Sequence, residues 1–207
     1  MTHTLNRRGI SDERPGEEIV VLCMAHCTEK ANKADAMRSI AATILKYRPS
    51  NYLGKPLGLE PEGLQMMAPV AGVVTAVFNN KEDVRRLIGD LKEQKLGVSV
   101  VLSGLFSDVR DICGSNGLNE HTYHMSLGIF GKTECLPDEK TLEITTQCGH
   151  SLISPALVAD VVRKMKRAKI TAAEGAALLV KPCACGIGNP ERIERIVQEM
   201  VTEGGKA

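Results

Sequence analysis

The sequence predicts an α/β protein in which strand-helix repeats build a layered, mostly parallel sheet, followed by a β-hairpin and a metal-linked section of three C-terminal helices. The first observation is that residues 18–25 form a continuous apolar run rich in β-branched side chains, which is typical of a strand buried on both faces. The second is that three such strands each precede a helix, and this succession favours parallel neighbours joined by right-handed crossovers. The third is a pair of Cys-containing half-motifs in the last quarter of the chain, which predicts the metal link.

Three strand-helix units are expected, in order, along the first 117 residues. Asn80 and Ser107 are suitable N-caps for the second and third helices. Gly114 and Gly117 can end the third helix. The expected strands are residues 18–25, 73–78 and 98–102, and the expected helices cover about 33–47 and the segments that begin after the two caps.

Residues 49–71 separate the first helix from the second strand. Because they hold four prolines and several glycines, we expect a long irregular connection. Such connections often bind ligands or partners, and an elaboration of the surface without a role is an equal alternative.

The character of the sequence changes after residue 117. Two strand-like runs predict a hairpin, residues 125–130 and 141–146. Ser154 is a good N-cap, and Thr171 with Glu174 forms a capping box. Helices are therefore expected at about 155–167 and 172–180, with a last one at about 190–203. These elements divide the chain into an α/β domain of residues 1–117 and a section of residues 118–207, packed with the first as one unit.

Length and composition exclude several classes of protein. A chain of 207 residues can bury a full core without disulfides. Its 26 Lys and Arg residues nearly balance 25 Asp and Glu residues, so neither a nucleic acid nor a membrane surface is an expected partner. A small molecule and a second copy of the chain are both compatible with this charge. The polar N-terminus lacks the apolar stretch of a signal peptide, which predicts a cytoplasmic protein. In that compartment seven cysteines indicate metal or thiol chemistry.

The two half-motifs carry the candidate metal site: Cys148, His150, Cys183 and Cys185. The short link between the helices at 155–167 and 172–180 predicts an antiparallel helical hairpin, which brings these four residues to one end. Three thiols and an imidazole suit a soft or borderline metal. A zinc ion could take all four, whereas an iron–sulfur cluster would take the three cysteines and a fourth group, either His150 or an upstream cysteine. Buried packing is the ordinary alternative for such cysteines.

Three residues are candidates for acid-base or nucleophilic chemistry. His121 and His124 lie in a polar cluster, and imidazole titrates near neutral pH, although two surface histidines are the simpler interpretation. Cys27 follows the first strand, at the carboxyl edge where ligands bind in parallel sheets. Its neighbour His26 would point the opposite way on an extended segment, so a direct pair is not expected.

Residues Gly186, Gly188 and Asn189 precede the last helix and could form a backbone nest for an anion. They lack the preceding strand and the spacing of a phosphate loop. The sequence therefore predicts a metal-binding protein that contains zinc or an iron–sulfur cluster. Three interpretations follow from it: a metalloenzyme acting on a small molecule, a redox-sensing or interaction protein whose metal is structural, and a metal-free ligand-binding domain with reduced cysteines.

Overall fold

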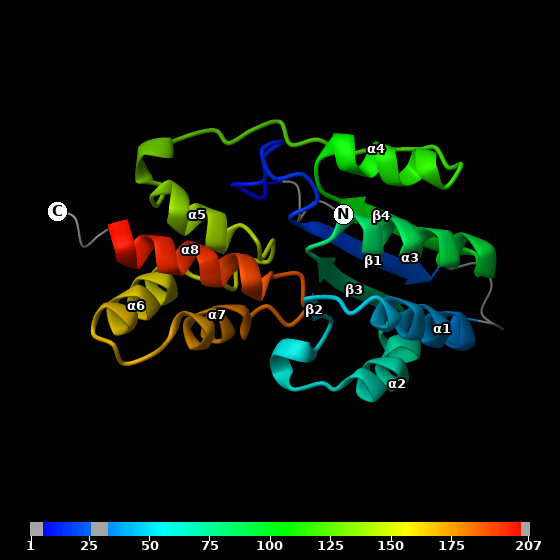
Figure 1. The fold of residues 1–207 in the computed structure, drawn as a ribbon, viewed down its shortest axis with the longest axis horizontal. Coiled ribbons are helices and arrows are strands. Elements are labelled where there is room, and N and C mark those ends of the chain that lie inside the picture. The colour runs from blue at the N-terminus through cyan, green and yellow to red at the C-terminus, as the bar shows by residue number, and fades with distance from the viewer. Residues whose placement is uncertain (1–5, 26–32, 204–207) are drawn as a thin grey trace. The chain divides into compact units, whose positions relative to one another are not determined.

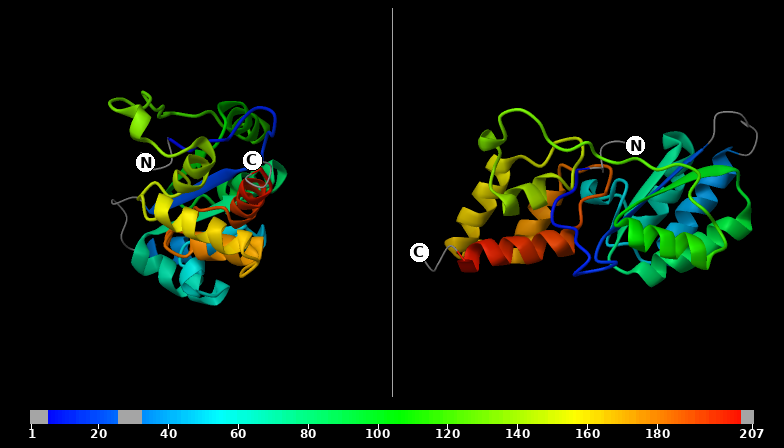
Figure 2. Two further views of the ribbon diagram at one scale, coloured as in Figure 1. Left: turned by 90° about the vertical axis from the view of Figure 1, so that its left-hand side faces the viewer. Right: turned by 90° about the horizontal axis from the view of Figure 1, so that it is seen from above.

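The computed structural model describes residues 6–25 and 33–203, and it divides them into two compact units (Figures 1 and 2). The sheet unit consists of Ile10–Thr122 with Cys185–Ile187. The helical unit contains the remaining described residues, which are 6–9, 123–184 and 188–203. Each unit is described below by itself.

The sheet unit is built on a four-stranded antiparallel sheet with the order β2-β3-β1-β4. The strands are β1 (Ile19–Ala25), β2 (Asn51–Tyr52), β3 (Val73–Phe78) and β4 (Val98–Ser103). The predicted positions of β1, β3 and β4 are therefore confirmed, but the predicted layered, mostly parallel sheet is wrong. The reason is that β1 and β2, and likewise β3 and β4, are joined by a helix without being neighbours: β3 lies between β1 and β2, and β1 lies between β3 and β4.

This interleaved connectivity is the split β-α-β arrangement of ferredoxin-like topologies, with an additional helix between β2 and β3. The registers place Val20 opposite Val77 on one side and opposite Ser103 on the other. Central strand β1 thus makes both of its ladders with strands that come much later in the chain.

Helices cover one face of this sheet. They are α1 (Lys33–Lys46), α2 (Pro61–Ala71), α3 (Lys81–Gln94) and α4 (Phe106–Ser115). Alternate residues of β1, namely Ile19, Val21 and Cys23, share a buried cluster with Met37 of α1 and Leu87 of α3. In the view of Figure 1, α1 and α3 lie in front of the strands. Burial of this apolar face is the main stabilising term for the sheet unit.

The sequence predicted a long irregular connection at residues 49–71, and this prediction is wrong. It contains β2, a turn of 3-10 helix at Lys55–Leu57, and α2. Pro61 occupies the first turn of α2, where a missing N–H costs nothing, and Gly72 ends the helix in the left-handed conformation with φ 65°. The four prolines of this stretch thus suggested a loop, although one of them, Pro61, begins a helix.

Of the two N-caps predicted for the sheet unit, one is confirmed and one is wrong. The Asn80 side chain accepts a hydrogen bond from the N–H of Glu82 at the start of α3. Ser107 is not a cap, because α4 begins at Phe106 with Leu105 in the N-cap position. The Ser107 hydroxyl instead donates to Asp12 at 3.2 Å.

The helical unit consists of a 3-10 turn at Thr133–Cys135 and four helices, α5 (Glu139–Thr145), α6 (Pro155–Lys166), α7 (Ala172–Val180) and α8 (Pro190–Glu203). Helix α7 packs against both α6 and α8. The predicted caps are confirmed, because Ser154 accepts from the N–H of Leu157 and the capping box of Thr171 with Glu174 is complete. The predicted helical hairpin of α6 and α7 is therefore present.

The predicted β-hairpin of residues 125–130 and 141–146 is wrong. The first segment has no regular structure, and the second is helix α5. Asp138 explains the helix, because its side chain accepts from the Thr141 N–H at 3.0 Å and from the Thr141 hydroxyl at 2.7 Å. An N-cap and burial of Leu142 and Ile144 outweigh the strand preference of the β-branched residues.

Candidate functional site

Two buried thiols meet in the helical unit. Cys148 lies in the loop between α5 and α6, and Cys183 lies in the loop after α7. The two side chains form a hydrogen bond to each other, and their exposed fractions are 2% and 0%. The sequence prediction that these two cysteines approach one another is thus realised in the structure.

The Cys148 sulfur also receives two hydrogen bonds from its own loop, donated by the backbone N–H groups of His150 and Leu152. The hydrogen bond with Cys183 and the burial of the thiol raise the Cys148 pKa far above its usual range, while the two N–H donors act in the opposite direction. Without a metal, Cys148 is therefore a protonated thiol at neutral pH. A bound metal would replace the proton, and the N–H donors are oriented to stabilise the resulting thiolate.

Gln147 fixes the loop that carries Cys148. Its side chain is fully buried, donates to the carbonyl of Glu143 at 3.2 Å, and accepts the backbone N–H of Asn189 at 2.8 Å. Its backbone carbonyl accepts from the Arg7 guanidinium at 2.7 Å. Gln147 therefore ties the start of α8 to the end of α5, and sequence analysis overlooked it. Its place directly before Cys148 was the only signal in the sequence.

The other two predicted ligands are not gathered around the thiol pair. His150 is exposed, and Cys185 is half-buried in the sheet unit, where its carbonyl oxygen accepts a hydrogen bond from the Thr75 hydroxyl. Within residues 6–25 and 33–203, no group of three or more Cys, His, Asp or Glu side chains is close enough together to hold a metal ion. The structure thus shows two members of the predicted ligand set together.

Polar groups of the predicted anion nest already form hydrogen bonds within the protein. The Asn189 N–H is bonded to Gln147, and the Asn189 side chain caps α8 by accepting the N–H of Arg192 at 3.2 Å. Gly186 adopts φ 66°, and a Cβ added to Gly188 would lie 3.6 Å from the Cys183 sulfur. These residues therefore shape the loop next to Cys183.

The predicted acid-base residues are not part of the thiol site. His121 and His124 are both exposed in a segment without regular structure, the first in the sheet unit and the second in the helical unit. Cys27 lies outside the described residues.

A cavity of about 400 Å³ opens beside Cys148 in the helical unit. Hydroxyl side chains contribute much of its lining: Thr145, Thr146, Ser151 and Ser154. A second cavity of about 550 Å³ shares Asn6, Pro137 and Leu142 with the first and is lined further by Arg7 and Arg8. The loop that carries Cys148 therefore forms one wall of the first cavity, while the side chain of Cys148 itself is buried.

Comparison of the chain with protein-family models, with curated proteins and with solved structures gave no match. Among the described residues, no helix is both long enough and apolar enough to cross a membrane.

Proposed function

We propose that the protein binds a soft or borderline metal, zinc or an iron–sulfur cluster, with Cys148 and Cys183 as its first two ligands. The observation that supports this most strongly is the contact between two buried cysteine side chains, one from the loop before the helical hairpin of α6 and α7 and one from the loop after it. Zinc and iron–sulfur centres both take cysteine thiolates, and two sulfurs in hydrogen-bonding contact need little rearrangement to share one ion or cluster.

His150 and Cys185 are the proposed remaining ligands. Each lies two positions after one member of the thiol pair, in a loop rather than in a helix. His150 is exposed, so a change of its side-chain rotamer requires no repacking of the core. The proposed ligand set is therefore Cys148, His150, Cys183 and Cys185, assembled when the metal binds.

The cavity beside Cys148 supports a catalytic centre that acts on a small molecule, because a catalytic metal keeps one position open to water or substrate. The alternative is a structural or redox-sensing metal in an interaction protein. Burial of both thiols supports this alternative, since a structural site has four protein ligands and contributes its binding free energy to folding.

Metal analysis of protein purified without oxygen tests the proposal. We expect about one equivalent of zinc, or iron with matching sulfide and a visible absorption band. Cys148→Ser and Cys183→Ser should each lose most of the metal. Cys113→Ser and Cys135→Ser are the matched controls, because Cys113 is half-buried in α4 and Cys135 is exposed. Wild-type protein without any transition metal, or equal loss in all four variants, would contradict the proposal.

X-ray absorption spectroscopy on the metal-loaded protein separates the catalytic role from the structural one. Three sulfur ligands and one nitrogen ligand at bond lengths of about 2.3 and 2.0 Å would indicate a closed structural site. An added oxygen ligand would indicate an open position. His150→Ala should remove the nitrogen contribution and leave the sulfur contribution unchanged.

A further inference from the structure

The second cavity of the helical unit, the arginine cavity, has a lining that is partly apolar and partly polar. Its volume of about 550 Å³ lies within the range of about 300 to 1,000 Å³ that is usual for small-molecule sites. The apolar part of the lining consists of Ile129, Leu136, Pro137 and Leu142. The arginine cavity therefore suits a small molecule that has an apolar part and a polar part.

The charges in the lining indicate the polar part of such a molecule. Among the described residues that line the arginine cavity, the charged ones are Arg7, Arg8 and Glu139. Two guanidinium groups and one carboxylate leave a single positive charge in excess. Inside a cavity this charge is less screened by water and salt than at an open surface. A ligand with one negative charge would balance the lining.

The two arginines differ in how far the protein already uses their side chains. The Arg7 guanidinium donates to the carbonyl of Gln147 at 2.7 Å and so helps to hold the loop before Cys148. The Arg8 side chain is 41% exposed, and its ion pair with Glu139 is loose, because its Nε lies 3.7 Å from the Glu139 Oε1. That distance is too long for a hydrogen bond, and within the described part of the chain this Nε has no hydrogen-bond partner.

The backbone of Arg8, by contrast, is held on both sides. Its N–H donates to the hydroxyl of Thr146 at 3.0 Å, and its carbonyl accepts a hydrogen bond from the guanidinium of Arg192, whose side chain is only 1% exposed. These contacts come from the end of α5 and the start of α8. The protein therefore fixes Arg8 at the arginine cavity through its backbone and leaves its guanidinium in one weak ion pair.

We propose that the arginine cavity binds a small organic acid whose single carboxylate pairs with the Arg8 guanidinium. The planar guanidinium matches a carboxylate with two parallel hydrogen bonds, which are among the stronger hydrogen bonds in proteins. The apolar part of the acid then contacts apolar residues of the lining, such as Leu136 and Ile129. The Glu139 side chain is 58% exposed, so it can turn into solvent without repacking when the acid binds. A phosphate monoester would bring a second negative charge that the lining does not balance.

Calorimetric titration of the full chain with three probes of equal tail length tests the ligand class. The probes are hexanoate, the neutral hexanamide, and hexyl phosphate at about pH 8, where the phosphate carries two charges. We expect hexanoate to bind with a Kd below about 1 mM and at least about tenfold more tightly than either of the other two. Equal binding of hexanoate and hexanamide, or no binding of any probe, would overturn the proposal. Tighter binding of hexyl phosphate would indicate a phosphate site in place of the carboxylate site.

Two arginine variants locate the binding group. Arg8→Gln should weaken hexanoate binding at least about tenfold, because it removes the charge and the paired donors. Arg163→Gln is the matched control, since Arg163 is an exposed arginine of α6 that pairs with Asp160 and lines neither cavity. It should bind hexanoate as the wild type does. Equal weakening in both variants would overturn the assignment of Arg8.

A third variant gives an expected gain, which a misfolded protein would not show. Glu139→Gln removes the carboxylate that competes with the ligand for Arg8 and should tighten hexanoate binding at least about threefold. The change keeps the size of the side chain, and Glu139 is exposed to solvent, so the fold should be retained. Unchanged or weaker binding in this variant would contradict the pairing of the ligand with Arg8.

Discussion

Gly186 has the most restricted position of any residue near the cysteines. Its φ is 66°, in the left-handed region, and a Cβ there would overlap the carbonyl of Tyr52 and lie 2.6 Å from the Leu53 nitrogen. Gly186→Ala should therefore destabilise the sheet unit by about 2 to 4 kcal/mol, through steric overlap with backbone and through the strained φ. Urea unfolding followed by circular dichroism measures the change.

Gly114 provides the control for this substitution. It lies inside α4, and a Cβ added there meets nothing within 4 Å. Gly114→Ala should leave stability unchanged or raise it by up to about 1 kcal/mol, since alanine is the better helix former. Similar destabilisation by both substitutions would contradict the steric argument.

Cys23 links stability to pH. It is fully buried in β1, and burial raises its pKa to about 12. The unfolded chain releases this proton near the usual thiol pKa of about 8.5, while the folded chain keeps it. The stabilising contribution is thus complete below that pH and is lost as the pH rises towards 12, at up to about 1.4 kcal/mol per pH unit.

Urea unfolding at about pH 9, 10 and 11 measures this loss, and Cys23→Ala is the comparison. The variant should be less stable at neutral pH because it leaves a cavity, but its stability should fall less steeply with pH than that of the wild type. Equal slopes would show that the Cys23 thiol does not contribute.

At the thiol pair, sequence reasoning succeeded where local signals were sufficient. The capping box of Thr171 and the short link between two helices predicted a hairpin, and a hairpin brings Cys148 towards Cys183. Gln147 could not be found in this way. Its role depends on a hydrogen bond to Asn189, a partner distant in the sequence, and a buried amide has no periodic pattern that marks it.

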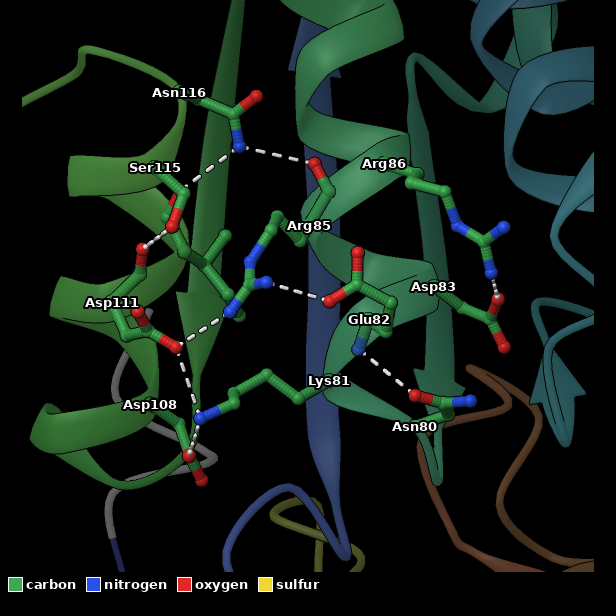
Figure 3. A network of polar contacts seen from close by, with 11 residues as sticks. Asn80, Lys81, Glu82, Asp83, Arg85, Arg86, Asp108, Asp111, Ser115 and Asn116 are labelled. Atoms are coloured by element: carbon green, nitrogen blue, oxygen red, sulfur yellow. Dashed lines mark hydrogen bonds and ion pairs between the residues drawn. The ribbon is translucent and has the colours of Figure 1, made fainter.

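Helices α3 and α4 are joined by a network of ion pairs that Figure 3 shows. Lys81 contacts Asp108 at 3.2 Å and Asp111 at 3.0 Å. Asp108 is 2% exposed and also accepts the Gly16 N–H at 2.7 Å, whereas the side chain of Asp111 is 43% exposed and also pairs with Arg85. The two carboxylates thus share a partner and differ in burial.

Asp108→Ala should destabilise the sheet unit by about 3 kcal/mol, because it leaves the buried Gly16 N–H without its acceptor and removes the buried one of the two carboxylates that contact Lys81. Asp111→Ala should cost less than about 1 kcal/mol, because its ion pairs are exposed to solvent. Chemical denaturation of the two variants provides the comparison, and an equal cost would show that burial does not decide the strength of this network.

Elements with a strong periodic pattern could be predicted from the sequence, whereas elements with a weak pattern could not. Strand β3 and helix α7 have the bounds that the sequence predicted. Strand β2 has two residues, too few for a pattern, and α2 has Pro69 in its interior. Helix α5 carries several β-branched residues, so its composition favoured a strand and only its Asp138 cap indicated a helix.

The direction of the strands could not be predicted, although their positions could. A run such as β1 is buried on both faces. Parallel strands require such burial, but a central antiparallel strand that is covered on both faces has it too. Pairing order depends on contacts between residues far apart in sequence, such as Val20 with Ser103. A single sequence does not contain that information locally.

Removal of the proposed metal tests the two units separately. A strong chelator should lower the melting temperature of the helical unit by about 10 °C or more, because a metal held by Cys148 and Cys183 contributes its binding free energy to that unit. The sheet unit has its own apolar core and should retain its hydrogen-exchange protection. Uniform loss of protection in both units, or none in either, would contradict this expectation.

The order of the sheet has a consequence for synthesis on the ribosome. Strand β1 emerges early, but its partners are β3 and β4, and the last of them ends at Ser103. With translation at about 5 to 20 residues per second, an apolar strand with two unpaired edges is exposed for several seconds before its ladders can close. Since unpaired apolar strands aggregate, the nascent chain should depend on chaperones over this interval and become independent of them once β4 has left the exit tunnel.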